Sequence, residues 1–437
     1  MPTSADILER FSLHRSHIDN RQALTPAYFE FLKRLGNPHQ HLPPVFHVAG
    51  TNGKGSTCAF LRAILEAAGY KVHVYTSPHL VRFHERIRIA GKLISEEELV
   101  ELLTVCQDKD QEAQVSAFEA ITAVAFAAFS RTPADFVILE TGLGGRLDAT
   151  NVVEKPLATL ITRLSYDHRD FLGHTLTQIA REKAGIMRTG VPCFTSAQSD
   201  AESISSLREA AAEIKAPLFM GGDSWRVTPT SAGFYFDDAH RHYDLPAPAL
   251  LGAHQFQNAG LAIAVLLVLP KPLSQEVIAK GLQTAEWPAR LQPIKQGVLA
   301  DLVPQNAELW LDGGHNDSAG EVLAIQAQKW ALQDGANPKP LCLIYGMLTT
   351  KKPQEFLQPL LPHIALVRTV TIPNKVAGFT ASDLATKVRD SGIQKVKEAV
   401  SVRAAISEIT QQVPNARILI CGSLYLAGDV LKYNAGE

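Results

Sequence analysis

A glycine-rich segment near the N-terminus has the order of residue types that binds phosphate. In VFHVAGTNGKGST (residues 45–57), an apolar run leads into glycines, then Lys54, then two hydroxyl residues that open a helical pattern. Glycines let backbone N–H groups converge on phosphate oxygens, and a helix N-terminus adds a favourable dipole. We expect Lys54 to lie against the β- and γ-phosphates of a nucleotide, with Ser56 or Thr57 supporting a metal ion. Because Gly55 departs from the general P-loop spacing, a glycine-rich turn with a solvated lysine is the alternative.

Three polar residues that follow expected strands form a candidate Mg²⁺ site. Asp135–Glu140 is a buried-strand pattern that ends in an acid, and Ser77 and His168 each follow a further apolar run. Ligands of open α/β sheets gather at the carboxyl ends of the strands, and carboxylates there hold Mg²⁺ directly or through water. Taken singly, each residue also has a structural interpretation: a loop-capping acid, a Ser-Pro turn, an isolated histidine. Their shared position beside a phosphate loop favours the metal site.

The elements that must position these residues alternate between strands and helices. From about Val45 onward, this alternation predicts an α/β protein with a largely parallel sheet. The expected strands are Val45–Val48, Lys71–Tyr75, Asp135–Glu140, Ala158–Thr162 and Val191–Thr195. Helices are expected between them, including Lys54–Ala68, Ser116–Phe129 and one that begins near Ser95.

The second half of the chain starts with a change of pattern. After Gly221 we expect a small antiparallel meander, then an apolar helix from about His254 to Leu269. A second α/β series follows, with strands expected at Val298–Leu302, Glu308–Asp312, Leu341–Tyr345, Val367–Ile372 and Arg417–Cys421. Two prolines mark Trp287–Gln296 as a linker. We therefore predict a P-loop ATPase-like, ATP-binding domain over residues 1–292 and a Rossmann-like C-terminal domain over residues 297–437.

Bulk composition argues against several classes of function. The 437 residues carry a net charge of −2, so no basic field exists that would recruit nucleic acid or an acidic membrane. The five cysteines are scattered and never form a CxxC pair, which argues against a disulfide scaffold or zinc site. No signal pattern opens the chain, and the longest apolar run is too short to cross a bilayer. We expect a cytoplasmic protein, with nothing that demands more than a monomer.

Several motifs occur together in a family-specific order. They are GTNGKGS, SPHL, ETGLGGRLDATN, DHRDFLG, REKAGI, HQFQNA and ICGSLYLAGDV. Together they resemble the Mur ligase superfamily, and within it the folylpolyglutamate synthase/dihydrofolate synthase branch. The resemblance covers nearly the whole chain. It implies an ATP-dependent ligase that couples L-glutamate to dihydropteroate and to the glutamyl tails of reduced folates, through an acyl phosphate, giving ADP and phosphate.

The resemblance also implies roles for individual residues. The phosphate loop of the family matches Gly50, Thr51, Asn52, Gly53, Lys54, Gly55, Ser56 and Thr57. Ser77, Glu140 and His168 match its Mg²⁺ ligands, and Lys183 matches a lysine that the family carbamylates. From sequence alone, Lys183 is only a helix lysine. Further nucleotide contacts match Asn258, Arg290, Asp312 and His315. The implied catalytic residues are Lys54, Glu140, His168 and Lys183, and a monovalent cation is left open.

A pterin site is implied by three further segments. The first two match Ser116, Ala117, Phe118 and Glu119, and Leu147, Asp148 and Ala149. Phe118 is the candidate stacking surface, although as a bare sequence feature it also fits a core residue. The third segment matches Ile18 and Asp19.

Other functions are weighed against this one. A monofunctional folylpolyglutamate synthase is the main alternative, and the LDATN segment with the pterin-loop match favours the bifunctional enzyme. A non-catalytic nucleotide-binding regulator would be expected to have lost Lys54, Glu140, His168 or Lys183, and all four are present. Cell-wall ligases need an additional N-terminal domain, for which the roughly 45 residues before the phosphate-loop strand are too few. A P-loop motor has no place for the second α/β domain.

Overall fold

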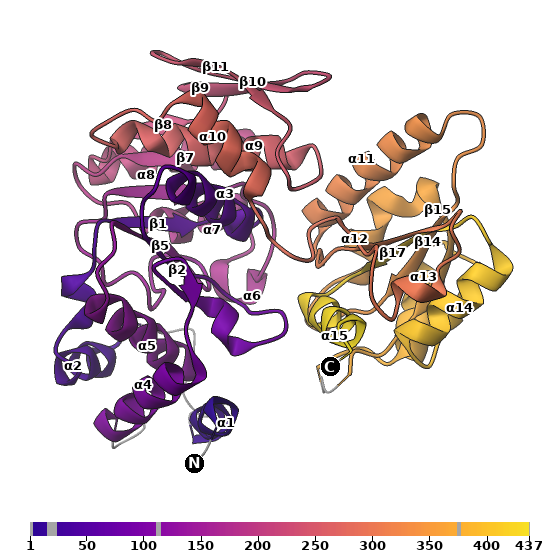
Figure 1. Cartoon of the computed structure of the whole chain (residues 1–437), viewed down its shortest axis with the longest axis horizontal. Coiled ribbons are helices and arrows are strands. Elements are labelled where there is room, and N and C mark those ends of the chain that lie inside the picture. Colours follow the sequence, from indigo (N-terminus) through magenta and orange to yellow (C-terminus); the bar gives the residue numbers. More distant parts are fainter. Residues whose placement is uncertain (1–2, 15–23, 111–114, 374–376, 437) are drawn as a thin grey trace. The chain divides into compact units, whose positions relative to one another are not determined.

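The structure, a computed structural model, describes residues 3–14, 24–110, 115–373 and 377–436 (Figure 1). The chain forms two compact units. The first comprises Met1–Ala249 and Gln255–Glu286, and the second Leu250–His254 and Trp287–Glu437. The boundary at Trp287 lies within the stretch expected to be a linker, and the division at residues 292 and 297 stays a prediction. In the described parts of the chain, no helix is long and apolar enough to cross a membrane.

An eight-stranded sheet forms the centre of the first unit, in the order β4-β3-β2-β5-β1-β6-β7-β8. Its strands are β1 (Val45–Ala49), β2 (Val72–Tyr75), β3 (Ile87–Ile89), β4 (Lys92–Leu93), β5 (Phe136–Glu140), β6 (Ala158–Ile161), β7 (Cys193–Thr195) and β8 (Leu218–Met220). All pairs are parallel except those of β3 with its two neighbours. Because β1 lies between β5 and β6, the strand order reverses at β1, and its carboxyl end is where such sheets bind ligands.

Helices cover both faces of this sheet (Figure 1). On one side, α3 (Lys54–Ala67) packs against β1, β2 and β5 and against α10 (Gln275–Thr284). On the other side, α4 (Glu96–Lys109) and α5 (Ala117–Arg131) share a core with α1 (Ser4–His14) and α2 (Pro26–Arg34). The remaining elements are α6 (Arg169–Leu172), α7 (Leu176–Ala184), α8 (Ala201–Ile214), α9 (His254–Ala264) and an antiparallel sheet of β9 (Trp225–Pro229), β10 (Gly233–Asp238) and β11 (His242–Pro246).

The second unit has a six-stranded sheet in the order β12-β13-β17-β14-β15-β16, parallel except for β12. Its strands are β12 (Gln292–Pro293), β13 (Glu308–Leu311), β14 (Leu341–Tyr345), β15 (Ile364–Thr369), β16 (Val396–Glu398) and β17 (Arg417–Cys421). Its helices are α11 (Asp317–Asp334), α12 (Pro353–Leu357), α13 (Ala381–Asp390), α14 (Val402–Gln412) and α15 (Leu424–Asn434). The predicted fold class is therefore confirmed.

One predicted strand is wrong. Val298–Leu302 was expected to be extended, but Ala300–Leu302 is a 3₁₀ turn. The backbone N–H of Val298 donates to the carbonyl oxygen of Asn434, and that of Leu299 donates to its side-chain oxygen. The segment is thus bonded to the end of α15 instead of to a neighbouring strand. The place beside β13 is taken by Gln292–Pro293, within the expected linker.

Candidate functional site

The phosphate loop joins β1 to the N-terminus of α3. Gly53 caps α3 with a φ of +92°, and a Cβ at this position would overlap the side-chain oxygen of Asn258. Gly50 has a φ of +145°, and a Cβ there would overlap the hydroxyl of Thr162. Both glycines are therefore required by conformation and by space. Since a helix leaves its first N–H groups without intrahelical acceptors, the first turn of α3 presents donors suited to phosphate.

Thr51 and Asn52 are tied to the loop that follows β6. Their backbone N–H groups donate to the carbonyl oxygen of Arg163, at 3.1 and 3.2 Å. Thr51 Oγ1 donates to the carbonyl oxygen of Ser165 and accepts from its N–H, and Asn52 Nδ2 donates to Ser165 Oγ at 3.0 Å. The backbone N–H groups of Thr51 and Asn52, and the side chain of Asn52, therefore hold the phosphate loop against the loop after β6. Ser165 was not singled out from the sequence.

Two lysines converge on the carbonyl oxygen of Gly50. Lys54 Nζ donates to it at 3.0 Å and to the carbonyl oxygen of Thr51 at 3.3 Å. Lys183 Nζ, from α7, donates to it at 3.0 Å. Lys183 is only 4% exposed. Burial, reinforced by the charge of Lys54, lowers the pKa of Lys183 to about 7.

Two of the metal-ligand candidates, Ser77 and Glu140, are in direct contact. Ser77 N–H donates to Glu140 Oε2 at 3.3 Å, and Glu140 is 3% exposed at the end of β5. His168 lies at the start of α6 with a half-exposed side chain. In the described ranges, no group of three or more His, Cys, Asp or Glu side chains could hold a metal ion. The carboxylate of Glu140 and the hydroxyl of Ser77 are oxygen ligands of the kind that Mg²⁺ takes, beside a loop suited to phosphates that would supply further oxygens.

α9 supports the phosphate loop from the side. Asn258 Nδ2 donates to Gln255 Oε1 at 2.9 Å, and Gln255 Nε2 donates to Ser56 Oγ at 3.3 Å. Asn258 and Gln255 are both buried. The predicted contact residue Asn258 is thus brought next to Gly53, and Gln255 is an additional supporting residue that the motif HQFQNA contained but that was not named.

The first predicted pterin segment, Ser116–Glu119, forms the start of α5. Ser116 caps the helix: its N–H donates to Glu119 Oε2 at 2.7 Å, and its hydroxyl accepts from Glu119 N–H. Ala117 is the first residue of α5. Phe118 is half-buried, and a Cβ at Gly142 would overlap the end of its ring. The glycine-rich loop after β5 therefore lies directly against the candidate stacking surface.

Asp148 holds that loop together. Its Oδ2 accepts from the N–H groups of Gly142 and Leu143, at 2.9 and 2.8 Å. Its Oδ1 accepts from the N–H and the hydroxyl of Thr150. Burial outweighs these bonds and raises the pKa of Asp148.

The segment around Asp148 is held from a second side. The next residue, Ala149, accepts a hydrogen bond from the hydroxyl of Tyr28 on α2, which sequence reasoning missed. Leu147 is half-buried. Ile18 and Asp19 lie outside the described residues.

The second unit gathers its own three candidates. Asp312 Oδ2 accepts from Leu291 N–H at 2.9 Å, and Oδ1 accepts from Gly314 N–H at 2.7 Å. Burial raises the pKa of Asp312, with the charge of Arg290 opposing that rise. His315 Nδ1 lies 3.0 Å from the carbonyl oxygen of Gly313. The structure therefore brings Arg290, Asp312 and His315 into one cluster.

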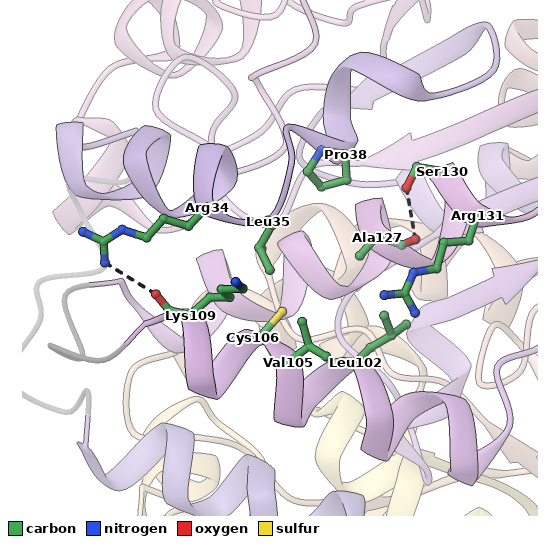
Figure 2. Close-up of a pocket in the computed structure, with 10 residues that line it drawn as sticks. All are labelled: Arg34, Leu35, Pro38, Leu102, Val105, Cys106, Lys109, Ala127, Ser130 and Arg131. Atoms are coloured by element: carbon green, nitrogen blue, oxygen red, sulfur yellow. Dashed lines mark hydrogen bonds between the residues drawn. The ribbon is translucent and has the colours of Figure 1, made fainter.

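A separate cavity of about 120 Å³ lies among α2, α4, α5 and the turn Pro38–His41 (Figure 2). Its lining combines apolar side chains with Arg34, Lys109 and Arg131. Arg34 donates to the carbonyl oxygen of Lys109, and Arg131 pairs with Glu101. The lining contains none of the residues predicted for the phosphate, metal or pterin sites, so the candidate site lies elsewhere.

Comparison with known proteins identifies the family. Residues 48–266 match the Mur ligase middle domain, and residues 296–433 match the C-terminal domain of dihydrofolate synthetase. A dihydrofolate synthase/folylpolyglutamate synthase of Bacillus subtilis is 35% identical over 424 residues, covering 92% of this chain and 93% of the relative. The chain belongs to the dihydrofolate synthase/folylpolyglutamate synthase family of Mur ligases. The resemblance inferred from the motifs is confirmed, as is the assignment to the ligases.

Solved structures of this family resemble this chain over nearly its full length. Escherichia coli FolC in complex with DHPP and ADP is 30% identical, with a TM-score of 0.83 and 99% of both chains covered. The bifunctional folylpolyglutamate synthase/dihydrofolate synthase of Yersinia pestis, complexed with AMPPNP and a Mn ion, is also 30% identical, with a TM-score of 0.84 and the same coverage.

Proposed function

We propose that this chain couples L-glutamate to dihydropteroate and to the γ-glutamyl tails of reduced folates, using ATP. This proposal rests on one observation: the phosphate loop and the loop that lies against Phe118 follow neighbouring strands of the same sheet. β5 ends in Glu140 next to the phosphate-loop strand, and the residues that follow it lie against Phe118. Such an arrangement suits a reaction that brings a phosphate and a pterin-bearing carboxylate together. The ADP and DHPP bound by the Escherichia coli relative support the same pairing of ligands.

Phosphoryl transfer needs positioning and charge stabilisation from the protein. The first-turn N–H groups of α3 and the ammonium of Lys54 would hold the phosphates of ATP. The substrate carboxylate attacks the γ-phosphorus and gives an acyl phosphate and ADP. The amino group of glutamate then attacks the activated carbonyl, and phosphate leaves from the tetrahedral intermediate. Lys54 offsets the negative charge that gathers on the transferring group.

Ser77, Glu140 and His168 are our candidates for holding Mg²⁺. The relative from Yersinia pestis was solved with a Mn ion and an ATP analogue, which supports a divalent ion in this family site. When bound, the ion would neutralise phosphate charge during transfer. Glu140 supplies the buried carboxylate, and Ser77 is held against it through its backbone N–H. Arg290, Asp312 and His315 in the second unit are candidates for further nucleotide contacts, together with Asn258 in the first.

The proposal includes carbamylation of Lys183. The neutral amine of Lys183 adds to CO₂, forming an N–C bond and releasing one proton, and the product is an anionic carbamate. A pKa near 7 supplies the neutral amine at physiological pH. The carbamate nitrogen keeps one N–H for the carbonyl oxygen of Gly50. Its negative charge would also remove the repulsion between Lys183 and Lys54.

The same proposal assigns an ATP-binding domain to residues 1–292 and a Rossmann-like domain to residues 297–437. We also propose a monomeric, cytoplasmic enzyme. All five cysteines are buried and lie scattered along the chain, which suits a reducing compartment.

One assay tests the proposed function. The purified protein is incubated with ATP, Mg²⁺ and L-glutamate, with 7,8-dihydropteroate in one tube and tetrahydrofolate in another. Mass spectrometry then looks for one added glutamate. We expect product in both tubes and none with Lys54→Ala. Product from tetrahydrofolate alone would make the chain a monofunctional folylpolyglutamate synthase, and product in neither tube would overturn the proposal.

A further inference from the structure

His47 is a buried histidine at the centre of β1 for which the mechanism above has no role. It is 1% exposed and lies three residues before Gly50, on the strand that leads into the phosphate loop. Burial lowers its pKa to about 3, so the ring is neutral at physiological pH. A neutral imidazole has one donor nitrogen and one acceptor nitrogen. Nε2 lies 2.9 Å from Thr150 Oγ1.

Thr150 determines which nitrogen of His47 carries the proton. Thr150 Oγ1 lies 2.6 Å from Asp148 Oδ1. Both oxygens of Asp148 accept from backbone N–H groups, and the Thr150 hydroxyl donates its single proton to Asp148 Oδ1. The hydroxyl oxygen must then accept from His47, which places the proton on Nε2. A directed chain of hydrogen bonds therefore runs from β1 through Thr150 to Asp148.

Asp148 extends this chain to the loop at Phe118. Its other carboxylate oxygen accepts from the N–H groups of Gly142 and Leu143. Gly142 in turn lies so close to the end of the Phe118 ring that no side chain fits between them. The position of the loop against the aromatic ring thus depends on the orientation of one carboxylate, and that orientation depends on Thr150 and His47.

We propose that His47 is a positioning residue for the pterin substrate, acting through Thr150 and Asp148 on the loop that lies against Phe118. This inference rests on the proposed function, in which the ring of Phe118 is the stacking surface for the pterin. His47 is covered by the sheet and its helices and acts on the substrate only through the loop. The same hydrogen bonds hold the loop after β5 in place relative to β1. Because β1 also leads into the phosphate loop, one strand positions both the loop against Phe118 and the phosphate loop.

Two matched pairs of variants test the inference. His47→Gln keeps an N–H near the position of Nε2, whereas His47→Leu removes it. Thr150→Ser keeps the hydroxyl, whereas Thr150→Val removes it at constant shape. We expect His47→Leu and Thr150→Val to raise the KM for dihydropteroate about tenfold, the effect of one lost buried hydrogen bond. The KM for ATP and kcat should change less than twofold, and the Gln and Ser variants should restore most of the loss.

The double variant His47→Leu/Thr150→Val adds a second criterion. Because both substitutions break the same chain, its KM for dihydropteroate should equal that of either single variant. Thermal unfolding and ADP binding are measured for every variant, and a fluorescence titration gives the dissociation constant of dihydropteroate. A KM for dihydropteroate within twofold of wild type, or equal rises in KM for ATP and dihydropteroate, would overturn the inference. If His47→Leu fails to fold, the Thr150 pair decides.

The same experiment separates this inference from the proposed function. An active wild type with unaffected variants overturns the positioning role alone. A wild type that uses neither pterin substrate overturns both.

Discussion

Lys183 Nζ donates a hydrogen bond of 3.0 Å to the carbonyl oxygen of Gly50, the first residue of the phosphate loop. The bond crosses 133 residues of sequence and ties α7 to the end of β1. Lys54 donates to the same oxygen. Two cationic side chains thus meet one carbonyl group in a buried place, where their mutual repulsion is poorly screened. Burial, reinforced by this repulsion, explains why Lys183 loses its proton more easily than an ordinary lysine.

The first prediction concerns pH and carbon dioxide. With a pKa of about 7, Lys183 is mostly protonated below pH 6 and mostly neutral above pH 8. Only the neutral amine adds CO₂, so activity should rise with pH across this window and fall when bicarbonate is removed by degassing. The Lys183→Arg variant carries a permanent positive charge and cannot be carbamylated. It should therefore lose more than 90% of activity while still binding ADP. Steady-state rates with and without bicarbonate provide the measurement, and a bicarbonate-independent rate would contradict carbamylation.

A second prediction tests whether the phosphate loop has room for a side chain at Gly53. In Gly53→Ala the new Cβ would overlap Asn258 Oδ1, at a φ of +92°. Gly36→Ala is the matched control, because its φ is +86° and nothing lies within 4 Å of the added Cβ. Both substitutions incur the backbone cost of about 1–2 kcal/mol, but only Gly53→Ala should weaken ADP binding, by more than tenfold. Calorimetric titration with ADP measures this. Equal affinities in the two variants would show that the overlap is relieved without moving the loop.

A third prediction concerns the contact between the phosphate loop and the loop after β6. Ser165→Ala removes the hydroxyl that accepts from Asn52 but keeps both backbone bonds to Thr51. A half-buried bond of this kind stabilises by about 1 kcal/mol, so the KM for ATP should rise about fivefold. Ser199→Ala is the control, because it removes an exposed hydroxyl that accepts from Arg163 Nη2 at 3.4 Å. An unchanged KM for ATP in Ser165→Ala would show that this contact does not support ATP binding.

The sequence specifies the fold best where a strand is buried on both faces. β14 and β17 begin and end where predicted, because a continuous apolar run bounded by polar or turn residues defines them locally. Val298–Leu302 has a shorter apolar run, interrupted by Asp301, and its conformation is set by bonds to Asn434 at the far end of the chain. Apolar pattern alone contains no information about such a partner.

The site follows the same rule. Lys54 and the glycines of its loop could be predicted because strand, turn and helix are consecutive in sequence. The supporting residues could not, because each acts on a partner far along the chain. Ser165 is 114 residues from Thr51, Tyr28 is 121 from Ala149, His47 is 103 from Thr150 and Gln255 is 199 from Ser56. Their residue types are ordinary for core or loop positions, so only the fold shows their roles.

The last prediction concerns Asp312 in the second unit. Each of its carboxylate oxygens accepts from one backbone N–H, and these bonds join the Arg290 segment to the loop after β13. The residues on either side of Arg290, Ala289 and Leu291, have φ values of +58° and +45°, which non-glycine residues rarely adopt. The bond to Leu291 helps to hold this strained backbone.

In Asp312→Asn, one oxygen becomes an NH₂ group that faces an N–H donor, so one bond is lost and two donors are opposed. We expect the free energy of unfolding to fall by about 1–3 kcal/mol. We also expect kcat/KM for ATP to fall by more than this loss of stability can explain. Asp301→Asn, at an exposed position in the same unit, is the control and should leave both unchanged. Chemical denaturation and steady-state kinetics measure the two quantities. Wild-type values for both in Asp312→Asn would mean that the Arg290 segment is held without this carboxylate.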